Sequence, residues 1–167
     1  KTRPVTMKRP DITIRTATQA DRDAINNVIE AAVMTWNLPQ RVKRLSLPSY
    51  RYTGIDFDHF EMVVAEDDPQ TTIGIAAWEP ADAKDAPAGH TALLLHGIYV
   101  DPSYHHQGIG RLLFQAAERA VRKHRCDGLL VKAQEDANGF FIAQGMNRLQ
   151  VEDPLRHYAN RFWKSTR

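Results

Sequence analysis

The 167-residue sequence has few cysteines, little net charge and no long apolar run. Cys126 is the only cysteine, so no disulfide can form within one chain, which is typical of a reducing compartment. No apolar run reaches the roughly 18 residues that a membrane-spanning helix needs, and residues 1–10 lack the apolar core of a signal peptide. We therefore expect a cytoplasmic protein that has no membrane partner.

The charge balance argues against one class of partner. Lysine and arginine total 22 against 20 acidic residues, a net charge of +2. Nucleic-acid-binding domains carry a much stronger basic surface than this. We expect no nucleic-acid partner.

The hydrophobic pattern predicts one mixed α/β domain. A chain of this length fits a single domain, so we assign residues 11–167 to it and treat residues 1–10 as a flexible N-terminal extension. The periodicity predicts strands at 11–15, 60–65, 71–78, 93–100, 128–133, 146–151 and 157–164, helices at 18–36, 108–124 and 135–144, and a short helix with a loop in 40–58. This order predicts an α+β fold with a central mixed sheet of about seven strands and about four helices on both faces.

The junction between the strand 93–100 and the helix 108–124 is the most informative segment. Gly108 and Gly110 open the helix, and a residue without a Cβ lets a ligand come close to the backbone. The first helical turn also offers amides without partners at the positive end of the helix dipole, which favours a phosphate. Two interpretations remain at this point: a phosphate site, or glycines needed only for a turn or for close packing. Leu113 stands where the dinucleotide fingerprint has its third glycine, and no P-loop sequence is present.

Two segments together resemble the GNAT superfamily of acyl-CoA-dependent N-acyltransferases. The phosphate loop of that superfamily reads Arg/Gln-x-x-Gly-x-Gly/Ala, and here His105 takes the first position before Gly108 and Gly110. Its second motif, Asn-x-x-Ala-x-x-Phe-Tyr-x-x-x-Gly-Phe, is similar in spacing to residues 134–146, with Gln134 in place of Asn, Phe141 in place of Tyr and methionine in place of the last Phe. The resemblance covers nearly the whole chain in its order of elements.

The resemblance implies a fold and a donor. The sheet would splay between its fourth and fifth strands, and the pantetheine of acetyl-CoA would pair there with the backbone of Ile98 and Val100. The pyrophosphate would bind the amides of residues 106–111. The residues that the resemblance places at the acetyl-CoA site are Ile98, Tyr99, Val100, His105, His106, Gln107, Gly108, Ile109, Gly110, Arg111, Gln134 and Phe141. Acetyl-CoA would serve as co-substrate.

His96 is the candidate catalytic base. An amine with a pKa near 10.4 costs about 4 to 5 kcal/mol to deprotonate at neutral pH, and histidine titrates nearest that pH. Strand alternation places His96 on the face of Leu94 and Ile98. The segment is similar to arylalkylamine N-acetyltransferases, which carry a His-x-His pair there, although Leu94 replaces the first histidine. The alternative is a strand histidine that hydrogen-bonds neighbouring backbone. Phe141 cannot protonate the leaving thiolate, and we assign no acid.

The sequence predicts the acceptor site less clearly than the acetyl-CoA site. In this superfamily the acceptor enters between the first helices and the strand hairpins, which makes aromatics and carboxylates in 36–61 the candidates. The aromatic candidates are Trp36, Tyr50, Tyr52 and Phe57, and the acidic ones are Asp56, Asp58 and Glu61. Such a set suits a cationic or aromatic amine, in a small molecule or a peptide. Core packing for the aromatics and solvated charge for the acids are the alternative.

The sequence thus predicts an enzyme that moves an acetyl group from acetyl-CoA to a primary amine by direct attack on the thioester. The alternative is a non-catalytic regulatory domain that binds acyl-CoA, which the departures at His105 and Phe141 allow. We expect no metal, because no histidine spacing matches a known tetrahedral set. We expect a monomer or a homodimer.

Overall fold

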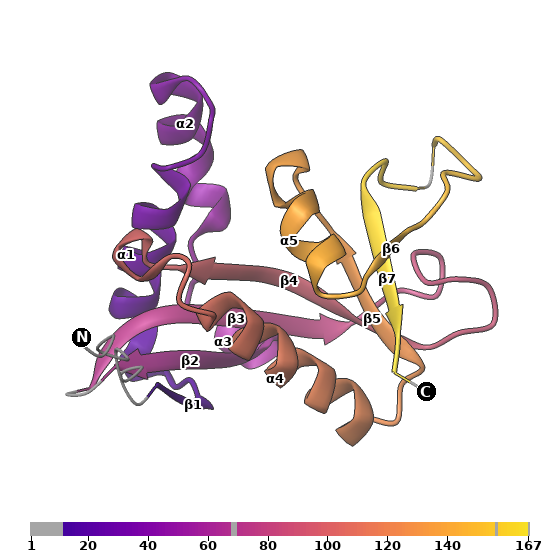
Figure 1. Cartoon of the computed structure of the whole chain (residues 1–167), viewed down its shortest axis with the longest axis horizontal. Coiled ribbons are helices and arrows are strands. Elements are labelled where there is room, and N and C mark those ends of the chain that lie inside the picture. Colours follow the sequence, from indigo (N-terminus) through magenta and orange to yellow (C-terminus); the bar gives the residue numbers. More distant parts are fainter. Residues whose placement is uncertain (1–11, 68–69, 156, 167) are drawn as a thin grey trace, which may run out of the picture.

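Our computed structural model describes residues 12–67, 70–155 and 157–166 (Figure 1). Seven strands form one mixed sheet in the order β1-β2-β3-β4-β5-β7-β6. The strands are β1 (Thr13–Thr16), β2 (Glu61–Asp67), β3 (Thr71–Pro80), β4 (Ala92–Val100), β5 (Gly128–Lys132), β6 (Asn147–Arg148) and β7 (Arg161–Ser165). The predicted mixed sheet of seven strands is confirmed. The predicted N-terminal extension, residues 1–10, lies outside the described residues.

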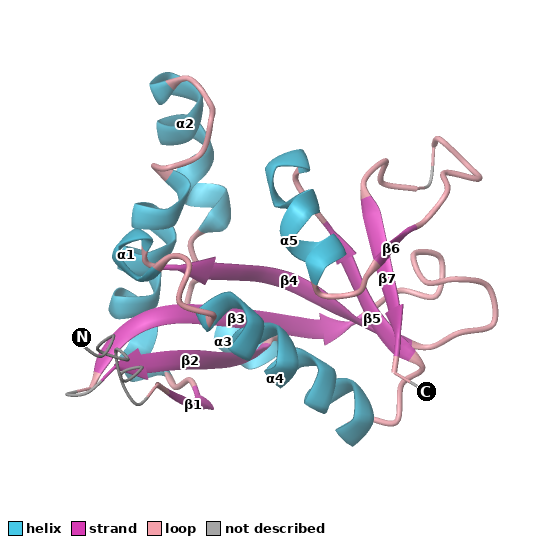
Figure 2. Cartoon of the chain, in the orientation of Figure 1, coloured by secondary structure: helices cyan, strands magenta, loops and turns pink. Residues whose placement is uncertain are grey.

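Helices lie on both faces of this sheet (Figure 2). The α-helices are α1 (Arg22–Val33), α2 (Gln40–Tyr50), α3 (Asp56–His59), α4 (Ile109–Lys123) and α5 (Asn138–Ala143). Three short 3-10 helices, Gln19–Asp21, Pro102–Tyr104 and Glu135–Ala137, precede α1, α4 and α5. In the described chain, α1 packs on β3 and β4 from one side, and α4 packs on β2 to β5 from the other.

The amphipathic pattern of α4 explains its position. Its buried residues include Leu113, Phe114, Ala117 and Val121, which recur at helical spacing and join the core of β3 to β5. The opposite core is formed by α1, whose Ile25, Val28 and Ile29 pack on the other face of the sheet together with Ile75 and Tyr99. The sheet therefore separates two apolar cores.

β4 and β5 are parallel neighbours that separate halfway along β4. Their register runs only from Ala92 opposite Gly128 to Leu95 opposite Val131. Beyond Leu95, β4 continues to Val100 with β3 as its paired neighbour among the described residues. The two strands diverge visibly in Figure 1. This divergence confirms the predicted splay between the fourth and fifth strands.

A bulge in β4 lies at the start of this splay. Ala77 pairs with Gly97 and Trp78 pairs with Leu95, so that His96 has no partner residue in the register with β3. One extra residue in one strand of an antiparallel pair bends that strand and interrupts the alternation of its side chains. The bulge therefore turns β4 away from β5 and changes which face each later residue takes.

Several element boundaries differ from the predictions. α1 ends at Val33 rather than near Trp36, and the Nζ of Lys43 in α2 donates a 2.8 Å hydrogen bond to the Met34 carbonyl just after that end. α2 is a full helix of 11 residues that tolerates Pro48 in its last turn. The predicted strand 146–151 is reduced to β6, and the predicted strand 157–164 begins only at Arg161. β6 is a two-residue edge strand and residues 157–160 before β7 are irregular, and such short or irregular segments carry a weak periodic signal.

Candidate active site

The loop from β4 to α4 forms a candidate anion site. Asp101 accepts the Ser103 amide at 2.9 Å and so begins the 3-10 turn, after which His106 and Gly108 both take left-handed conformations with φ of 61° and 80°. Gly108 is the N-cap of α4. The amides of Ile109 to Arg111 belong to the first turn of a 15-residue helix, and the positive end of the helix dipole faces the loop. This geometry fits a phosphate group.

The two glycines of this loop have different roles. Gly108 supplies the left-handed conformation that begins the helix. At Gly110, a Cβ would lie 2.9 Å from the Cε2 atom of Phe140 in α5, so this glycine allows close packing between α4 and α5. Gly108 thus has the turn role and Gly110 the packing role of the second interpretation, while the phosphate site stays a prediction.

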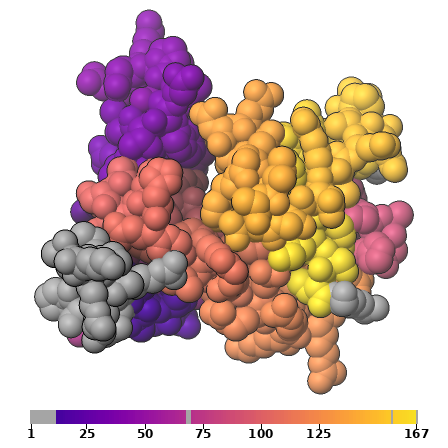
Figure 3. Space-filling view, in the orientation of Figure 1, coloured from indigo at the N-terminus to yellow at the C-terminus, as the bar shows by residue number. Residues whose placement is uncertain are grey.

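The side chains of the loop are exposed, apart from Ile109. His105, His106, Gln107 and Arg111 are all exposed, and the His105 ring hydrogen-bonds the Val100 carbonyl at 3.3 Å. Ile109 is buried in the core beneath them. In the space-filling view this loop surface borders both the first helices and α5 (Figure 3).

The far half of β4 offers a backbone edge beside this loop. Ile98 and Val100 pack their side chains into the α4 core, whereas the ring of Tyr99 is buried on the α1 side. The side chain of Tyr99 therefore faces the other core, and only its backbone remains for a ligand in the gap between β4 and β5. A strand edge without a paired neighbour can bind an extended amide-containing ligand.

Gln134 and Phe141 are the two residues beyond β5 that were predicted to bind acetyl-CoA, and their surroundings differ. Gln134 is half-buried, and its amide Nε2 donates to the Tyr50 hydroxyl at the end of α2, 84 residues away in the sequence. Phe141 is only 5% exposed and lies among Phe114, Phe140 and Phe162. Gln134 can present a polar group at the surface, while Phe141 belongs to the apolar core.

Asn160 is a buried residue near the same end of β5 that the sequence interpretation missed. Its Nδ2 donates to the Ala133 carbonyl at 2.9 Å and to Asn138 Oδ1 at 2.6 Å, and its backbone carbonyl accepts from the Ala133 amide. These bonds join the end of β5 to the start of α5. No local sequence pattern predicts this role, because the partners of Asn160 are far from it in the sequence.

His96 lies at the bulge of β4 with two aromatic neighbours. Its ring is 4.5 Å, centroid to centroid, from Phe60 and 5.6 Å from Tyr52. The Tyr52 hydroxyl and His96 Nδ1 form a hydrogen bond of 2.9 Å. The residue itself is exposed, so one part of the imidazole reaches solvent while its Nδ1 side contacts Tyr52. A partly exposed imidazole can exchange a proton with an incoming amine.

Neighbouring protein atoms shift the pKa of His96. Loss of hydration lowers this pKa from its ordinary value, and the carboxylates of Glu79 and Asp56 oppose that shift. A lowered pKa keeps the imidazole neutral at physiological pH, which is the form that a base requires. Nearly complete burial raises the pKa of the Tyr52 hydroxyl well above its usual range, so that Tyr52 keeps its proton.

The predicted face of His96 is right for Leu94 and wrong for Ile98. Leu93 and Leu95 pack in the α4 core, so Leu94 faces the opposite side of the sheet, as His96 does, whereas Ile98 packs in the α4 core. The bulge at His96 is the physical reason, because an extra residue changes the alternation from that point on. His96 instead contacts Tyr52 and Phe60 on the α1 side.

The four aromatic residues predicted for the acceptor belong to one apolar cluster on the α1 side, but they lie at different places around it. Trp36 and Tyr50 pack edge to face with centroids 5.0 Å apart, and Tyr52 lies with His96. Phe57 lies in a different place, on the wall of the groove described next. Trp36, Tyr50 and Tyr52 each contact another predicted site residue.

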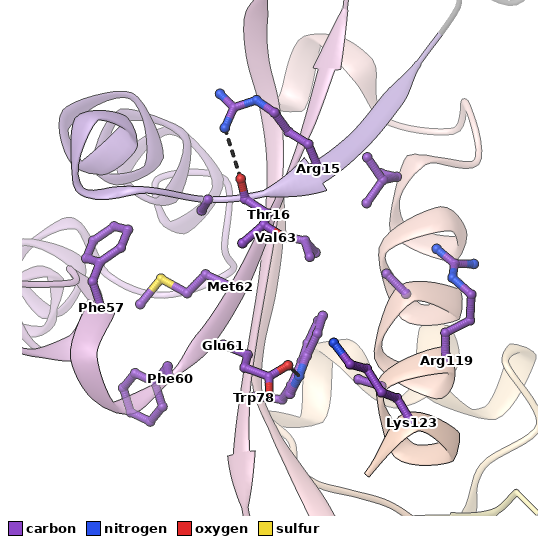
Figure 4. A pocket seen from close by; sticks show the side chains of 14 residues that line it. Arg15, Thr16, Phe57, Phe60, Glu61, Met62, Val63, Trp78, Arg119 and Lys123 are labelled. Atoms are coloured by element: carbon purple, nitrogen blue, oxygen red, sulfur yellow. Dashed lines mark hydrogen bonds between the residues drawn. The ribbon is translucent and has the colours of Figure 1, made fainter.

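A groove of about 620 Å³ lies between the β1–β2 edge of the sheet and the second half of α4 (Figure 4). Its lining includes Phe57 and Phe60 on one side and Arg119 and Lys123 on the other. Glu61, an acidic acceptor candidate, lines it as well. This carboxylate accepts from Trp78 Nε1 at 3.1 Å and contacts His124 Nε2 at 2.5 Å. The groove is therefore remote from the helix N-terminus of α4, and Phe60 connects it to His96.

Sequence reasoning missed three residues around His96. Phe60 contacts the imidazole, Glu79 supplies a nearby negative charge from β3, and Asn26 of α1 fixes the backbone of Tyr52. Each comes from a different element, and no sequence spacing links any of them to position 96.

Two absences hold for the part of the chain that the structure describes. No helix in these parts of the chain is long and apolar enough to cross a membrane. No group of three or more His, Cys, Asp or Glu side chains in the same ranges could hold a metal ion.

Comparison with known proteins gives a family. The acetyltransferase (GNAT) domain family matches residues 58–145, which is more than half of the chain. The chain belongs to the GNAT acetyltransferase family. The match includes β2 to β5, the whole of α4 and α5, and His96. No curated protein matches the sequence.

Solved structures share this GNAT fold at low sequence identity. A GNAT acetyltransferase from Staphylococcus aureus Mu50 is 13% identical with a TM-score of 0.69, over 93% of this chain and 99% of that one. The PaiA N-acetyltransferase of Thermoplasma acidophilum, in complex with coenzyme A, is 15% identical with a TM-score of 0.73, over the same shares of the two chains. A GNAT acetyltransferase from Brucella melitensis, in complex with acetyl-CoA, is 20% identical with a TM-score of 0.63, over 92% and 87%.

Proposed function

We propose that this GNAT protein is an N-acetyltransferase that moves an acetyl group from acetyl-CoA to a primary amine, with His96 as general base. The observation that supports this proposal most is the adjacency of two features. The α4 N-terminus, begun by left-handed Gly108, follows β4 after the short loop 101–108, and His96 lies at the bulge where β4 leaves β5. Coenzyme A or acetyl-CoA in two solved structures of the same fold agrees with the proposed donor.

The fit of the chain to acetyl-CoA is testable group by group. The amides of residues 106–111 would bind the pyrophosphate, and the backbone of Ile98 and Val100 would hold the pantetheine amides. Gln134 would add a polar side chain from the other wall of the gap. An acetyl thioester held this way supplies an activated carbonyl carbon within reach of β4.

His96 would then accept the proton of the attacking amine. The nitrogen–carbon bond forms as the carbon–sulfur bond breaks, and the amine proton passes to the imidazole. Phe141 has no hydroxyl, and a thiolate with a reference pKa of about 8.5 is a tolerable leaving group near neutral pH. The thiolate can therefore take its proton from solvent, and the mechanism needs no dedicated acid.

The acceptor is proposed to be a small-molecule or peptide amine. Its carboxylate contacts near the base would come from Asp56 and Glu79, both half-buried beside His96. Tyr52 and Phe60 add aromatic surface at the same place. Aromatic rings together with carboxylates favour a cationic acceptor over an anionic one.

The decisive experiment measures thiol release from acetyl-CoA on a panel of primary amines. His96→Ala should lower kcat/KM by about 10²- to 10⁴-fold and remove the acid limb of the pH–rate profile. His157→Ala is the matched control, because that ring caps the Asp153 amide in the C-terminal loop. An unchanged profile in His96→Ala would refute the base. Tight binding of coenzyme A without any thiol release would instead support the non-catalytic, acyl-CoA-binding alternative.

A further inference from the structure

The Tyr52 hydroxyl and the His96 ring are in contact at the bulge of β4. The Tyr52 hydroxyl lies 2.9 Å from His96 Nδ1, although the residues are 44 positions apart. Tyr52 is 3% exposed, so water does not compete for its hydroxyl group. Because Tyr52 is withdrawn from water, breaking this hydrogen bond would leave its hydroxyl without a partner, which is costly.

Asn26 fixes the position of Tyr52 from the other side. Asn26 Oδ1 accepts the Tyr52 amide at 2.9 Å, and Asn26 Nδ2 donates to the Tyr52 carbonyl at 2.9 Å. Asn26 lies in the middle of α1, which packs on β3 and β4. The segment after α2 is thus tied to the rigid core at the residue whose hydroxyl reaches His96.

The contact with Nδ1 determines which nitrogen of His96 can react. Among the described residues Nε2 has no hydrogen-bond partner, so it is the nitrogen available to a substrate. A neutral imidazole carries one proton, on either Nδ1 or Nε2. A base at Nε2 needs the form with the proton on Nδ1, and a tyrosine oxygen can accept that proton in a hydrogen bond.

We propose that Tyr52 is a positioning residue for His96: its hydroxyl oxygen accepts the Nδ1 hydrogen, leaves the Nε2 lone pair for the acceptor amine and stabilises the imidazolium that forms. This inference rests on the proposed function, in which His96 is the base. It assigns to Tyr52 a role in catalysis that needs no contact with the acceptor.

The proton balance of the step is complete. Nε2 takes one proton from the amine as the nitrogen–carbon bond forms and the carbon–sulfur bond breaks. The Nδ1 proton stays on the ring, and Tyr52 keeps its own proton throughout. The exposed imidazolium then releases the Nε2 proton to water, and the thiolate takes one from water.

Other groups that face His96 do not change with the Tyr52 hydroxyl. Asp56 of α3 and Glu79 of β3 act on it as negative charges, and Phe60 packs against its ring. The Tyr99 hydroxyl lies over the neighbouring Gly97, 3.1 Å from where a Cβ would stand. Tyr52→Phe keeps all four groups and the ring at position 52. Any change in the pKa of His96 then reports the missing hydroxyl.

The test combines NMR with kinetics on the full chain. Protein labelled with ¹⁵N-histidine is titrated from acid to alkaline pH, and His96→Ala identifies the His96 ring signals. Wild type should show the neutral form with its proton on Nδ1. In Tyr52→Phe the pKa of His96 should fall by about one unit, because the imidazolium loses a hydrogen-bond acceptor. A rise would mean that Tyr52 donates to neutral Nδ1, and that outcome, an unchanged pKa or a wild-type ring protonated on Nε2 would overturn the proposal.

Kinetics supply the second readout. Tyr52→Phe should lower kcat about 10- to 100-fold at the pH optimum and move the acid limb of the profile down with the pKa, while KM for acetyl-CoA stays unchanged. Tyr158→Phe, an exposed tyrosine in the C-terminal loop, is the matched control and should keep wild-type kcat. A Tyr52→Phe enzyme with wild-type kcat contradicts the positioning role. A chain that acetylates no amine contradicts the proposed function, and the NMR titration then still decides the direction of the hydrogen bond.

Discussion

Gly110 and Phe140 lie so close together that no side chain fits between them. A Cβ on Gly110 would be 2.9 Å from Phe140 Cε2 and 3.3 Å from its Cζ. Gly110 belongs to the first turn of α4, and Phe140 belongs to α5 beyond β5. The turn that is proposed to bind the pyrophosphate is thus held in place by the helix on the other side of the gap.

Gly110→Ala should destabilise the protein. The added methyl group must displace the Phe140 ring, and such overpacking typically costs about 1–3 kcal/mol in the free energy of unfolding. Gly139→Ala is the matched control, since no atom lies within 4 Å of its Cβ position and alanine favours a helix by up to about 1 kcal/mol. Urea denaturation compares the two variants. Equal stability of both would contradict the packing role of Gly110.

A second pair of glycines separates backbone strain from ligand binding. Gly108 and Gly89 have nearly the same left-handed φ, 80° and 77°, so alanine at either should cost about 1–2 kcal/mol in stability. Gly108 begins α4, whereas Gly89 lies in the loop before β4, with no atom within 4 Å of its Cβ position. Only Gly108→Ala should also weaken coenzyme A binding, by about 10-fold or more in a calorimetric titration. If both variants bind coenzyme A equally well, the α4 N-terminus is not its site.

Most of the fold could be predicted because its signals are local. α4 combines an apolar stripe with a glycine start, and β3 and β4 are long apolar runs bounded by turn residues. α2 and β6 were harder to predict. Pro48 has a low helix propensity but lies within α2, and β6 has only two residues, which is too short for a periodic pattern. Tertiary packing decides such elements, and a single sequence does not display it.

The candidate site was predictable only in part, for a related reason. The loop 105–111 and His96 could be found because their residue types and their spacing in the sequence match known motifs. The bulge that places His96 depends on register with β3, and its partner Tyr52 comes from a segment that packs there only because α1 fixes it. Periodicity assumes an unbroken strand, so it placed Ile98, which lies beyond the bulge, on the face of His96, whereas the two side chains lie on opposite faces.

Stability at acid pH should depend on Asp21. Arg15 donates to both its carboxylate oxygens, at 2.7 and 2.8 Å, and these hydrogen bonds lower the pKa of Asp21 below its ordinary value. The folded state therefore holds fewer protons than the unfolded state, and the stabilisation exists above the unfolded pKa near 3.9 and disappears as pH falls through the folded value. Asp21→Asn should lower the urea midpoint at pH 7 and show a smaller further loss between pH 5 and pH 3. Asp23→Asn, at an exposed position in α1, is the control, and a wild-type slope in Asp21→Asn would refute the role of this carboxylate.

Asn26 offers a test of how firmly the site depends on α1. Asn26→Ala removes both hydrogen bonds to the Tyr52 backbone and leaves a buried amide and carbonyl unpaired, at about 1–3 kcal/mol for each unpaired group. Asn27→Ala changes the exposed neighbour on the same helix and should stay within about 0.5 kcal/mol of wild type. Because Tyr52 would lose its anchor, Asn26→Ala should also lower kcat while KM for acetyl-CoA remains near the wild-type value. A loss of stability without any loss of kcat would show that His96 keeps its position without this anchor.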